Sequence, residues 1–144
     1  MAPFARVDGT LHCEGVPLDR LAESVGTPAY VYSASSIRTQ FGRLSQALAP
    51  VPHRIHYACK ANSSLGLLSL LRALGARIDV VSGGELFRAR AAGFAPSDII
   101  FGGVGKSPRE LREAIAAGVH VISIESEAEL RLLALLLGDV VRDG

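Results

Sequence analysis

From residue 54 to the end of the chain, short apolar runs alternate with longer amphipathic stretches. The apolar runs are rich in β-branched residues and bounded by polar ones, which favours strands, and they cover residues 55–59, 78–81, 99–101 and 119–124. Each run is followed by polar residues, an amphipathic stretch and a glycine. In the first amphipathic stretch Leu67, Leu71 and Leu74 fall on one face at helical spacing. The pattern predicts a repeated strand–helix unit.

Local signals mark both ends of the predicted helices. Three Ser-x-x-Glu sequences are typical of capping boxes, in which the serine and the glutamate each accept a hydrogen bond from a free backbone N–H at a helix start. These sequences pair Ser82 with Glu85, Ser107 with Glu110, and Ser126 with Glu129. Glycine follows each amphipathic stretch, where a residue of positive φ often ends a helix; these glycines are Gly75, Gly93, Gly118 and Gly138. The strands joined by such helices should be parallel, with right-handed crossovers.

The predicted fold class is α/β. No Gly-x-Gly-x-x-Gly follows the first strand, so the repeats favour a (β/α)₈ barrel over an open dinucleotide-binding sheet. Only about four βα units are present, whereas a barrel needs about eight over ~250 residues. After Gly138 the chain ends where a fifth strand should begin. We therefore expect residues 51–144 to be the first half of a barrel, in an N-terminal fragment of a larger protein.

Residues 1–50 have a different pattern. We expect a strand over residues 10–16, a helix over 18–25 that ends at Gly26, a strand over 27–32 and a helix over 35–48. Pro50 and Pro52 separate this α+β lead-in from the repeats. The lead-in should pack outside the barrel.

Composition narrows the possible partners. The chain of 144 residues is 49% hydrophobic and has a net charge of +1, which gives no reason to expect nucleic acid or an anionic membrane as partner. Two cysteines are too few for a disulfide framework, so a cytoplasmic location is expected. The N-terminus lacks the pattern of a signal peptide, and no apolar run reaches the ~20 residues of a membrane helix.

Lys60 is the main candidate for chemistry. Only two of the 15 lysines and arginines are lysines, and Lys60 follows the first predicted strand, at the carboxyl edge where the sites of βα proteins lie. There His56, Ala58 and Lys60 share a face, which we expect to line the barrel interior. A desolvated lysine amine can attack a carbonyl and form a Schiff base, as with pyridoxal phosphate (PLP). From the residues alone, an ion pair with Asp79 or Glu85 remains an open alternative.

Two acidic residues are further candidates. Asp79 lies inside an otherwise apolar strand, and a buried carboxylate is costly unless it meets a cation or belongs to a site. Glu85 already has a structural explanation as the acid of a capping box, so a role in the site would be additional.

The other reactive side chains have simpler interpretations. Gly105-Lys106-Ser107 is similar to part of a phosphate-binding loop, but Ile100 stands where that loop needs glycine. Lys106 is therefore expected to be an exposed residue just before a capped helix. Cys59 should point into the helical layer as inert packing, and His56 is most simply a hydrogen-bonded core histidine. No metal site is expected, since the remaining histidines lack ligand spacing; they are His12, His53 and His120.

Several motifs carry a family resemblance. They are Tyr57-Ala58-Cys59-Lys60-Ala61-Asn62 and residues 75–86, 92–94, 100–107 and 125–127, with residues 26–32 in the lead-in. In these stretches the chain resembles the N-terminal part of the PLP-dependent decarboxylases of the alanine-racemase-like barrel group. The likeness is greatest to the branch that removes a carboxylate from meso-2,6-diaminopimelate to give L-lysine. It covers nearly the whole chain.

The resemblance implies roles for particular residues. Lys60 would carry PLP as a Schiff base, and Asp79 and Glu85 match acidic positions near the cofactor and lysine. It further implies an amino-acid substrate and a homodimer for the full-length protein. The ring-stacking histidine, the phosphate loop and the substrate-binding residues of the family would all lie beyond residue 144, so the fragment by itself should be inactive.

Two other interpretations stay open. A related decarboxylase could act on ornithine, arginine or carboxynorspermidine, since the residues that set specificity lie downstream. A non-catalytic regulatory relative could use the same barrel to bind a partner. The presence of Lys60 argues against this second alternative, because a pure binding module has no need of a Schiff-base lysine.

Overall fold

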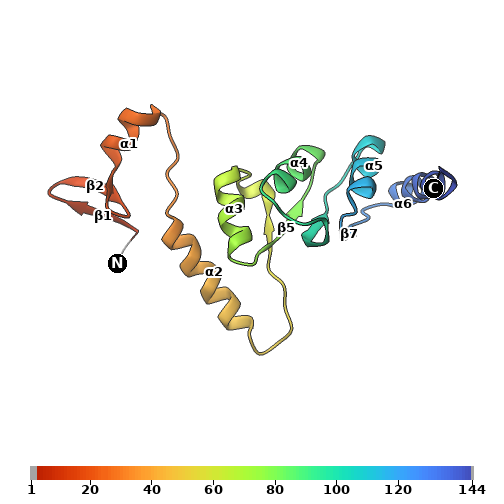
Figure 1. Ribbon diagram of the computed structural model, residues 1–144, viewed down its shortest axis with the longest axis horizontal. Helices are drawn as coiled ribbons and strands as arrows, with labels where there is room; N and C mark the ends of the chain where they lie inside the picture. The colour runs from red at the N-terminus through yellow and green to blue at the C-terminus, as the bar shows by residue number, and fades with distance from the viewer. Residues whose placement is uncertain (1–2, 144) are drawn as a thin grey trace. The chain divides into compact units, whose positions relative to one another are not determined.

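The computed structural model describes residues 3–143, and the side chains of residues 3–138. The chain divides into two compact units, Met1–Pro52 and His53–Gly144. Figure 1 shows the elements of each unit in chain order.

The first unit contains a small antiparallel sheet and two helices. Its strands are β1 (Phe4–Val7), β2 (Thr10–Cys13) and β3 (Val16–Pro17), paired in the order β1-β2-β3. Its helices are α1 (Leu18–Val25) and α2 (Ala34–Leu48). The helix predicted over residues 18–25 is confirmed, with Gly26 at its end at a φ of 82°.

Two strand predictions for this unit are wrong. The run over residues 10–16 is a hairpin rather than one strand, because Glu14 (φ 51°) and Gly15 (φ 85°) take the left-handed conformation of a tight turn between β2 and β3. Residues 27–32 form no strand, although their composition favours one. A strand needs a neighbour for its backbone hydrogen bonds, and no described strand pairs with this segment, in which Tyr30 is 90% exposed. In addition, β1 is a strand that the pattern of residues 1–9 did not predict.

Glu14 joins this hairpin to the start of α2. Its Oε1 accepts hydrogen bonds from the Ser33 hydroxyl and from the Ser35 backbone N–H (2.6 Å). Ser33 in turn accepts from the N–H of Ser36 (3.0 Å) and so caps the helix. The hydrogen bonds from Ser33 and Ser35 lower the pKa of the Glu14 carboxyl below its ordinary value.

The second unit is the repeated βα structure that the sequence predicts. A four-stranded parallel sheet has the order β4 (His56–Ala58), β5 (Arg77–Val80), β6 (Ile99–Phe101) and β7 (Val121–Ile122). The strands are connected by α3 (Leu65–Ala73), α4 (Gly83–Ala91) and α5 (Pro108–Ala117), and α6 (Glu127–Asp143) follows β7. Consecutive helices contact one another along the sheet (Figure 1). The predicted parallel βα order is confirmed, with a shorter last strand than expected.

The two faces of this sheet differ in burial. On the face toward the helices the strands bury their largest side chains completely; these are Ile78, Val80, Ile99 and Phe101. On the opposite face Ala58, Asp79 and Ile100 are partners in register and are only half-buried. Complete burial of one aliphatic side chain contributes about 1.5–3 kcal/mol, so the helix-facing layer is the core of the unit.

Three of the four glycines end helices or helical turns as predicted. Gly75, Gly93 and Gly118 have positive φ values of 87°, 89° and 68°. The prediction for Gly138 is wrong, since α6 continues past it to Asp143. Glycine tolerates helical φ at a cost of about 1 kcal/mol, and its left-handed conformation is an option rather than an obligation.

The helix starts show how the predicted capping boxes work. At α5 both halves are present: Ser107 accepts from the N–H of Glu110, and Glu110 accepts from the N–H of Ser107. At α4 the glutamate reaches one residue further back, because Glu85 Oε2 accepts from the N–H of Val81 (2.8 Å). In addition, Glu110 Oε1 accepts from the N–H of Gly83 (2.9 Å) and so joins α5 to the start of α4.

The bond between Glu110 and Gly83 generates a prediction. We expect Glu110→Gln to lower the hydrogen-exchange protection of the Gly83 and Ser107 amides about fivefold at pH 7, since a charged acceptor is worth about 1 kcal/mol more than a neutral one. Hydrogen bonds from Gly83 and Ser107 lower the pKa of the Glu110 carboxyl, so this stabilisation is present above its ordinary pKa of 4.5 and is lost as the pH falls through the lowered value. The difference between wild type and variant should therefore shrink below pH 4.5.

The matched control is Glu127→Gln. Glu127 lies at the start of α6 and has an exposed ion pair with Arg131. Mass-spectrometric exchange on both variants tests the prediction, and equal protection of Gly83 in the two would contradict it.

Candidate functional site

Lys60 lies directly after β4, in a 3₁₀ turn over Cys59–Ala61. Lys60 is exposed to solvent and lies at the carboxyl edge of the parallel sheet. Strand geometry stops at Ala58, so the predicted strand ends one residue early and Cys59 lies outside it. Among the described residues no ion pair joins Lys60 to Asp79 or Glu85, which removes the structural alternative that the sequence left open.

The segment after Lys60 is held in place from two sides. The Tyr57 hydroxyl donates to the carbonyl of Asn62 (3.0 Å), and the Arg88 Nε donates to the carbonyl of Ser63 (2.7 Å). Because Tyr57 belongs to β4 and Arg88 to α4, the segment is fixed to both the sheet and the next helix. The role of Arg88 could not be predicted from the sequence, since a carbonyl 25 residues away leaves no local signal.

Asp79 is the neighbour of Ala58 on the adjacent strand. The two residues are partners in register, so Asp79 lies beside the last residue of β4. That residue, Ala58, precedes Lys60 by two positions. It is half-buried, and none of the described ion pairs or side-chain hydrogen bonds includes it. Of the two alternatives that the sequence left open for Asp79, a cation or a role in a site, these contacts give no support to a cation within the described chain. Its carboxylate is therefore available for a group outside the described residues.

Gly102, in the segment after β6, leaves room for that carboxylate. A Cβ at Gly102 would lie 3.1 Å from the Asp79 Oδ1, a distance tighter than nearly all real contacts. At Gly103, with a φ of 85°, a Cβ would lie 3.0 Å from the Cβ of Val81. Two consecutive glycines thus let the backbone after β6 approach the end of β5 closely.

Glu85 reaches the same end of the sheet from α4. Its carboxylate accepts the N–H of Val81 while its own N–H donates to Ser82 Oγ (3.2 Å). Burial, together with the nearby charges of Glu85 and Asp79, raises the pKa of the neighbouring Cys59 thiol to about 11. The structure therefore brings Asp79 and Glu85 close to the residue that precedes Lys60, and it confirms Cys59 as a buried, unreactive thiol.

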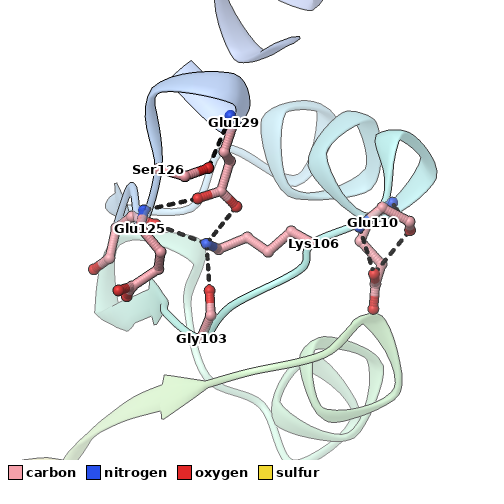
Figure 2. A network of polar contacts seen from close by, with 8 residues as sticks. Gly103, Lys106, Glu110, Glu125, Ser126 and Glu129 are labelled. Atoms are coloured by element: carbon pink, nitrogen blue, oxygen red, sulfur yellow. Dashed lines mark hydrogen bonds and ion pairs between the residues drawn. The ribbon is translucent and has the colours of Figure 1, made fainter. Parts of the chain in front are cut away.

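Lys106 is not the exposed residue that the sequence predicts. Its side chain is only 1% exposed, and its Nζ donates three hydrogen bonds of 2.7 Å, to the carbonyls of Gly103 and Ser123 and to Glu129 Oε1. Figure 2 shows Lys106 extended toward this group of acceptors. The expectation failed because Ser123 and Glu129 are distant in the sequence and close only in the fold. All three protons of the ammonium are used, which makes Lys106 a poor candidate for Schiff-base chemistry.

Glu129 completes this network from the start of α6. Its Oε2 accepts the N–H of Glu125 (2.8 Å), and its own N–H donates to Ser126 Oγ (3.2 Å). Hydrogen bonds from Lys106 and Glu125 lower the pKa of the Glu129 carboxyl, although burial opposes the shift. The pair is thus a buried, hydrogen-bonded ion pair, in which the loss of either partner would strand a charge.

Other parts of the described chain add little to the site. His56 has a buried Nδ1 without a hydrogen-bond partner there, so it is not the satisfied core histidine that the sequence suggests. Within residues 3–138 no cluster of three or more histidine, cysteine or acidic side chains is placed to bind a metal ion. None of the described helices is long and apolar enough to cross a membrane.

The side chains at this edge fit an aldehyde cofactor with a polar ring. Lys60 offers an exposed primary amine, and Asp79 offers a carboxylate without a partner on the adjacent strand. These are the groups that a pyridoxal derivative would engage through its carbonyl and its polar substituents.

Comparison with known proteins agrees with this fit. A diaminopimelate decarboxylase of Pseudomonas aeruginosa is 47% identical over 133 residues, which cover 92% of this chain and 32% of the relative. The crystal structure of diaminopimelate decarboxylase from M. jannaschii with L-lysine superposes with a TM-score of 0.89 at 31% identity, over 96% of this chain and 33% of that one. The chain thus spans about a third of the length of the relatives it matches.

A more distant solved structure shows the limit of the likeness. A lysine/ornithine decarboxylase from Vibrio vulnificus in complex with putrescine has a TM-score of 0.72 at 27% identity, covering 80% of this chain and 31% of its own. Residues 34–140 match the family described as "Pyridoxal-dependent decarboxylase, pyridoxal binding domain". This match covers most of the chain, including Lys60, Asp79 and Glu85. The chain belongs to the pyridoxal-dependent decarboxylases, as part of their pyridoxal binding domain.

Proposed function

We propose that this chain is the N-terminal part of an enzyme that decarboxylates meso-2,6-diaminopimelate to L-lysine, with PLP bound at Lys60. In this proposal residues 1–50 are a lead-in to a further domain and residues 51–144 are the first half of the barrel. The whole enzyme is a cytoplasmic homodimer, and the 144 residues alone are inactive because they hold only part of the site. The observation that carries the proposal is the exposed Lys60 at the carboxyl edge of the sheet. The adjacent strand carries Asp79, which has no ion-pair partner among the described residues, and the helix after that strand carries Glu85.

Each residue contributes a separate part of the site. When bound, PLP supplies an electron sink for the electrons left by the departing carboxylate. Lys60 would hold the cofactor carbon, and its position is fixed because Tyr57 and Arg88 anchor the segment that follows it. Asp79 would accept a hydrogen bond from a polar group of the cofactor or hold a positive charge near it. Glu85 would add negative charge beside Lys60 while it caps α4.

The choice of substrate is supported by the relatives. The first relatives, at 36–49% identity, all carry the name diaminopimelate decarboxylase. Solved decarboxylases of ornithine, lysine/ornithine and arginine are 25–27% identical. We therefore favour diaminopimelate over ornithine, arginine or carboxynorspermidine as the substrate.

The role of Lys60 can be tested directly. We expect borohydride reduction of the full-length protein with PLP to label the peptide that contains Lys60, because its amine is exposed while that of Lys106 is saturated with hydrogen bonds. Peptide mapping by mass spectrometry locates the label, and Lys60→Ala should abolish it. A label on Lys106, or a labelled Lys60→Ala variant, would sink the assignment.

The substrate prediction has its own assay. The full-length protein should release CO₂ from meso-2,6-diaminopimelate with a kcat/KM at least about 100-fold above that for L-ornithine or L-arginine, because a polar site rejects analogues that leave its groups unpaired. The 144-residue chain alone should show no turnover. Faster release from ornithine or arginine would transfer the proposal to that branch, and no release from any substrate would favour a regulatory relative.

We expect substitutions of Asp79 and Glu85 to differ in their effects on protein stability. We expect Asp79→Asn to weaken PLP binding about tenfold without loss of thermal stability, because Asp79 has no partner among the described residues. Glu85→Gln should also destabilise the protein by about 1 kcal/mol, since Glu85 accepts the N–H of Val81 and its charge strengthens that bond. Cofactor titration and thermal melts of the cofactor-free protein measure the two effects. A large loss of stability in Asp79→Asn would refute its assignment to the cofactor.

A further inference from the structure

The buried pair of Lys106 and Glu129 lies at the same edge of the sheet as the proposed site, yet the proposed chemistry does not use it. The Lys106 Nζ binds the backbone at the end of two successive βα units, through the carbonyls of Gly103 after β6 and Ser123 after β7. Glu129 adds the start of α6 to the same point (Figure 2). One ammonium group therefore holds three segments that meet only in the folded chain.

The segment that Lys106 holds also passes close to Asp79. Gly103 is adjacent to Gly102, where a Cβ would lie 3.1 Å from the Asp79 Oδ1. The N–H of Gly102 donates to the carbonyl of Val80 (2.8 Å), so the segment is hydrogen-bonded to β5 beside Asp79. The bound carbonyl of Gly103 limits the φ and ψ of this glycine, which are otherwise soft, so loss of the Lys106 contact would let the adjoining Gly102 shift. The space open to the carboxylate therefore depends on where Lys106 places the segment.

We propose that Lys106, with Glu129, is a positioning residue that sets the place of the Asp79 carboxylate in the cofactor site by holding the Gly102–Gly103 backbone. This inference rests on the proposed function, since Asp79 is taken to face the cofactor. Burial of a charged pair is costly unless its geometry is good and its remaining hydrogen-bonding groups are satisfied, and here the ammonium has three acceptors at 2.7 Å. An arginine at position 106 would be bulkier and planar, and it could not point three protons at these acceptors from one atom.

The test uses the double variant Lys106→Met/Glu129→Gln in the full-length protein. Replacing both partners avoids a stranded charge, and glutamine keeps an acceptor for the N–H of Glu125. In the cofactor-free protein, exchange of the Gly102 amide should accelerate about tenfold. The affinity for PLP should fall about tenfold, as expected when a site group is misplaced. Arg109→Met is the control, because Arg109 is 82% exposed and belongs to the helix that follows Lys106.

A double-mutant cycle separates positioning from a general loss of structure. If Lys106 acts through Asp79, the tenfold loss of PLP affinity should vanish when Asp79→Asn is already present, since interacting residues are not additive. The same loss in both backgrounds would overturn the proposal, and so would unchanged PLP affinity in the double variant. Gly102→Ala places a methyl group 3.1 Å from the Asp79 Oδ1 and leaves the ion pair intact, so it moves the carboxylate itself and should reproduce the loss even if the double variant fails to fold. Unchanged PLP affinity in Gly102→Ala would also overturn the proposal.

PLP binding by the unmodified protein distinguishes failure of the proposed function from failure of the proposed role of Lys106. If unmodified protein takes no PLP on Lys60, the proposed function fails, and the inference fails with it. If unmodified protein binds PLP and the variants bind it equally well, only the positioning role of Lys106 is refuted.

Discussion

The second unit depends on satisfying the free backbone N–H groups where each helix begins. In a parallel βα structure the strands end and the helices start at one edge, so these unpaired donors gather where a site would be built. Glu85, Glu110 and Glu129 each accept such an N–H, and their serines accept another. This constraint places three carboxylates along the same edge for structural reasons before any chemistry is considered.

Two of these glutamates also connect one βα unit to another. Glu110 reaches the N–H of Gly83 in the preceding unit, and Glu129 reaches Lys106. Capping residues therefore hold neighbouring units in place at the edge where Lys60 lies. The same interactions that stabilise helix starts limit the movement of the segments around the cofactor site, so stability and function are linked through shared carboxylates.

Asp79 differs from the capping acids because it stabilises nothing that the structure describes. A half-buried carboxylate without a partner is a cost to the fold, and such a cost is typical of a functional position. Because the two residues after β6 are glycines, the backbone there can lie close to the end of β5 and still leave room for the Asp79 carboxylate. Family membership, the exposed amine of Lys60 and the unpaired Asp79 all point to the same end of the sheet.

The sequence alone determined those features that depend on neighbouring residues. Hydrophobic periodicity predicted the four parallel strands and their helices, and Ser-x-x-Glu predicted the helix starts, because these signals act within one turn or one strand. The motif around Lys60 led to the family for the same reason, since its residues are contiguous. Local pattern failed over residues 27–32, where a strand depended on a distant partner, and at Gly138, where glycine permits a helix to continue as well as to end.

Only the tertiary structure decided which polar groups meet. Lys106 was expected in solvent and is buried, because its acceptors Ser123 and Glu129 are 17 and 23 residues away. Asp79 was expected either to meet a cation or to belong to a site, and it has no ion-pair partner among the described residues, because the two neighbouring strands present Ala58 and Ile100 to it. Hydrogen bonds and ion pairs act over a few ångströms in space, and the sequence does not contain those distances until the sheet has assembled.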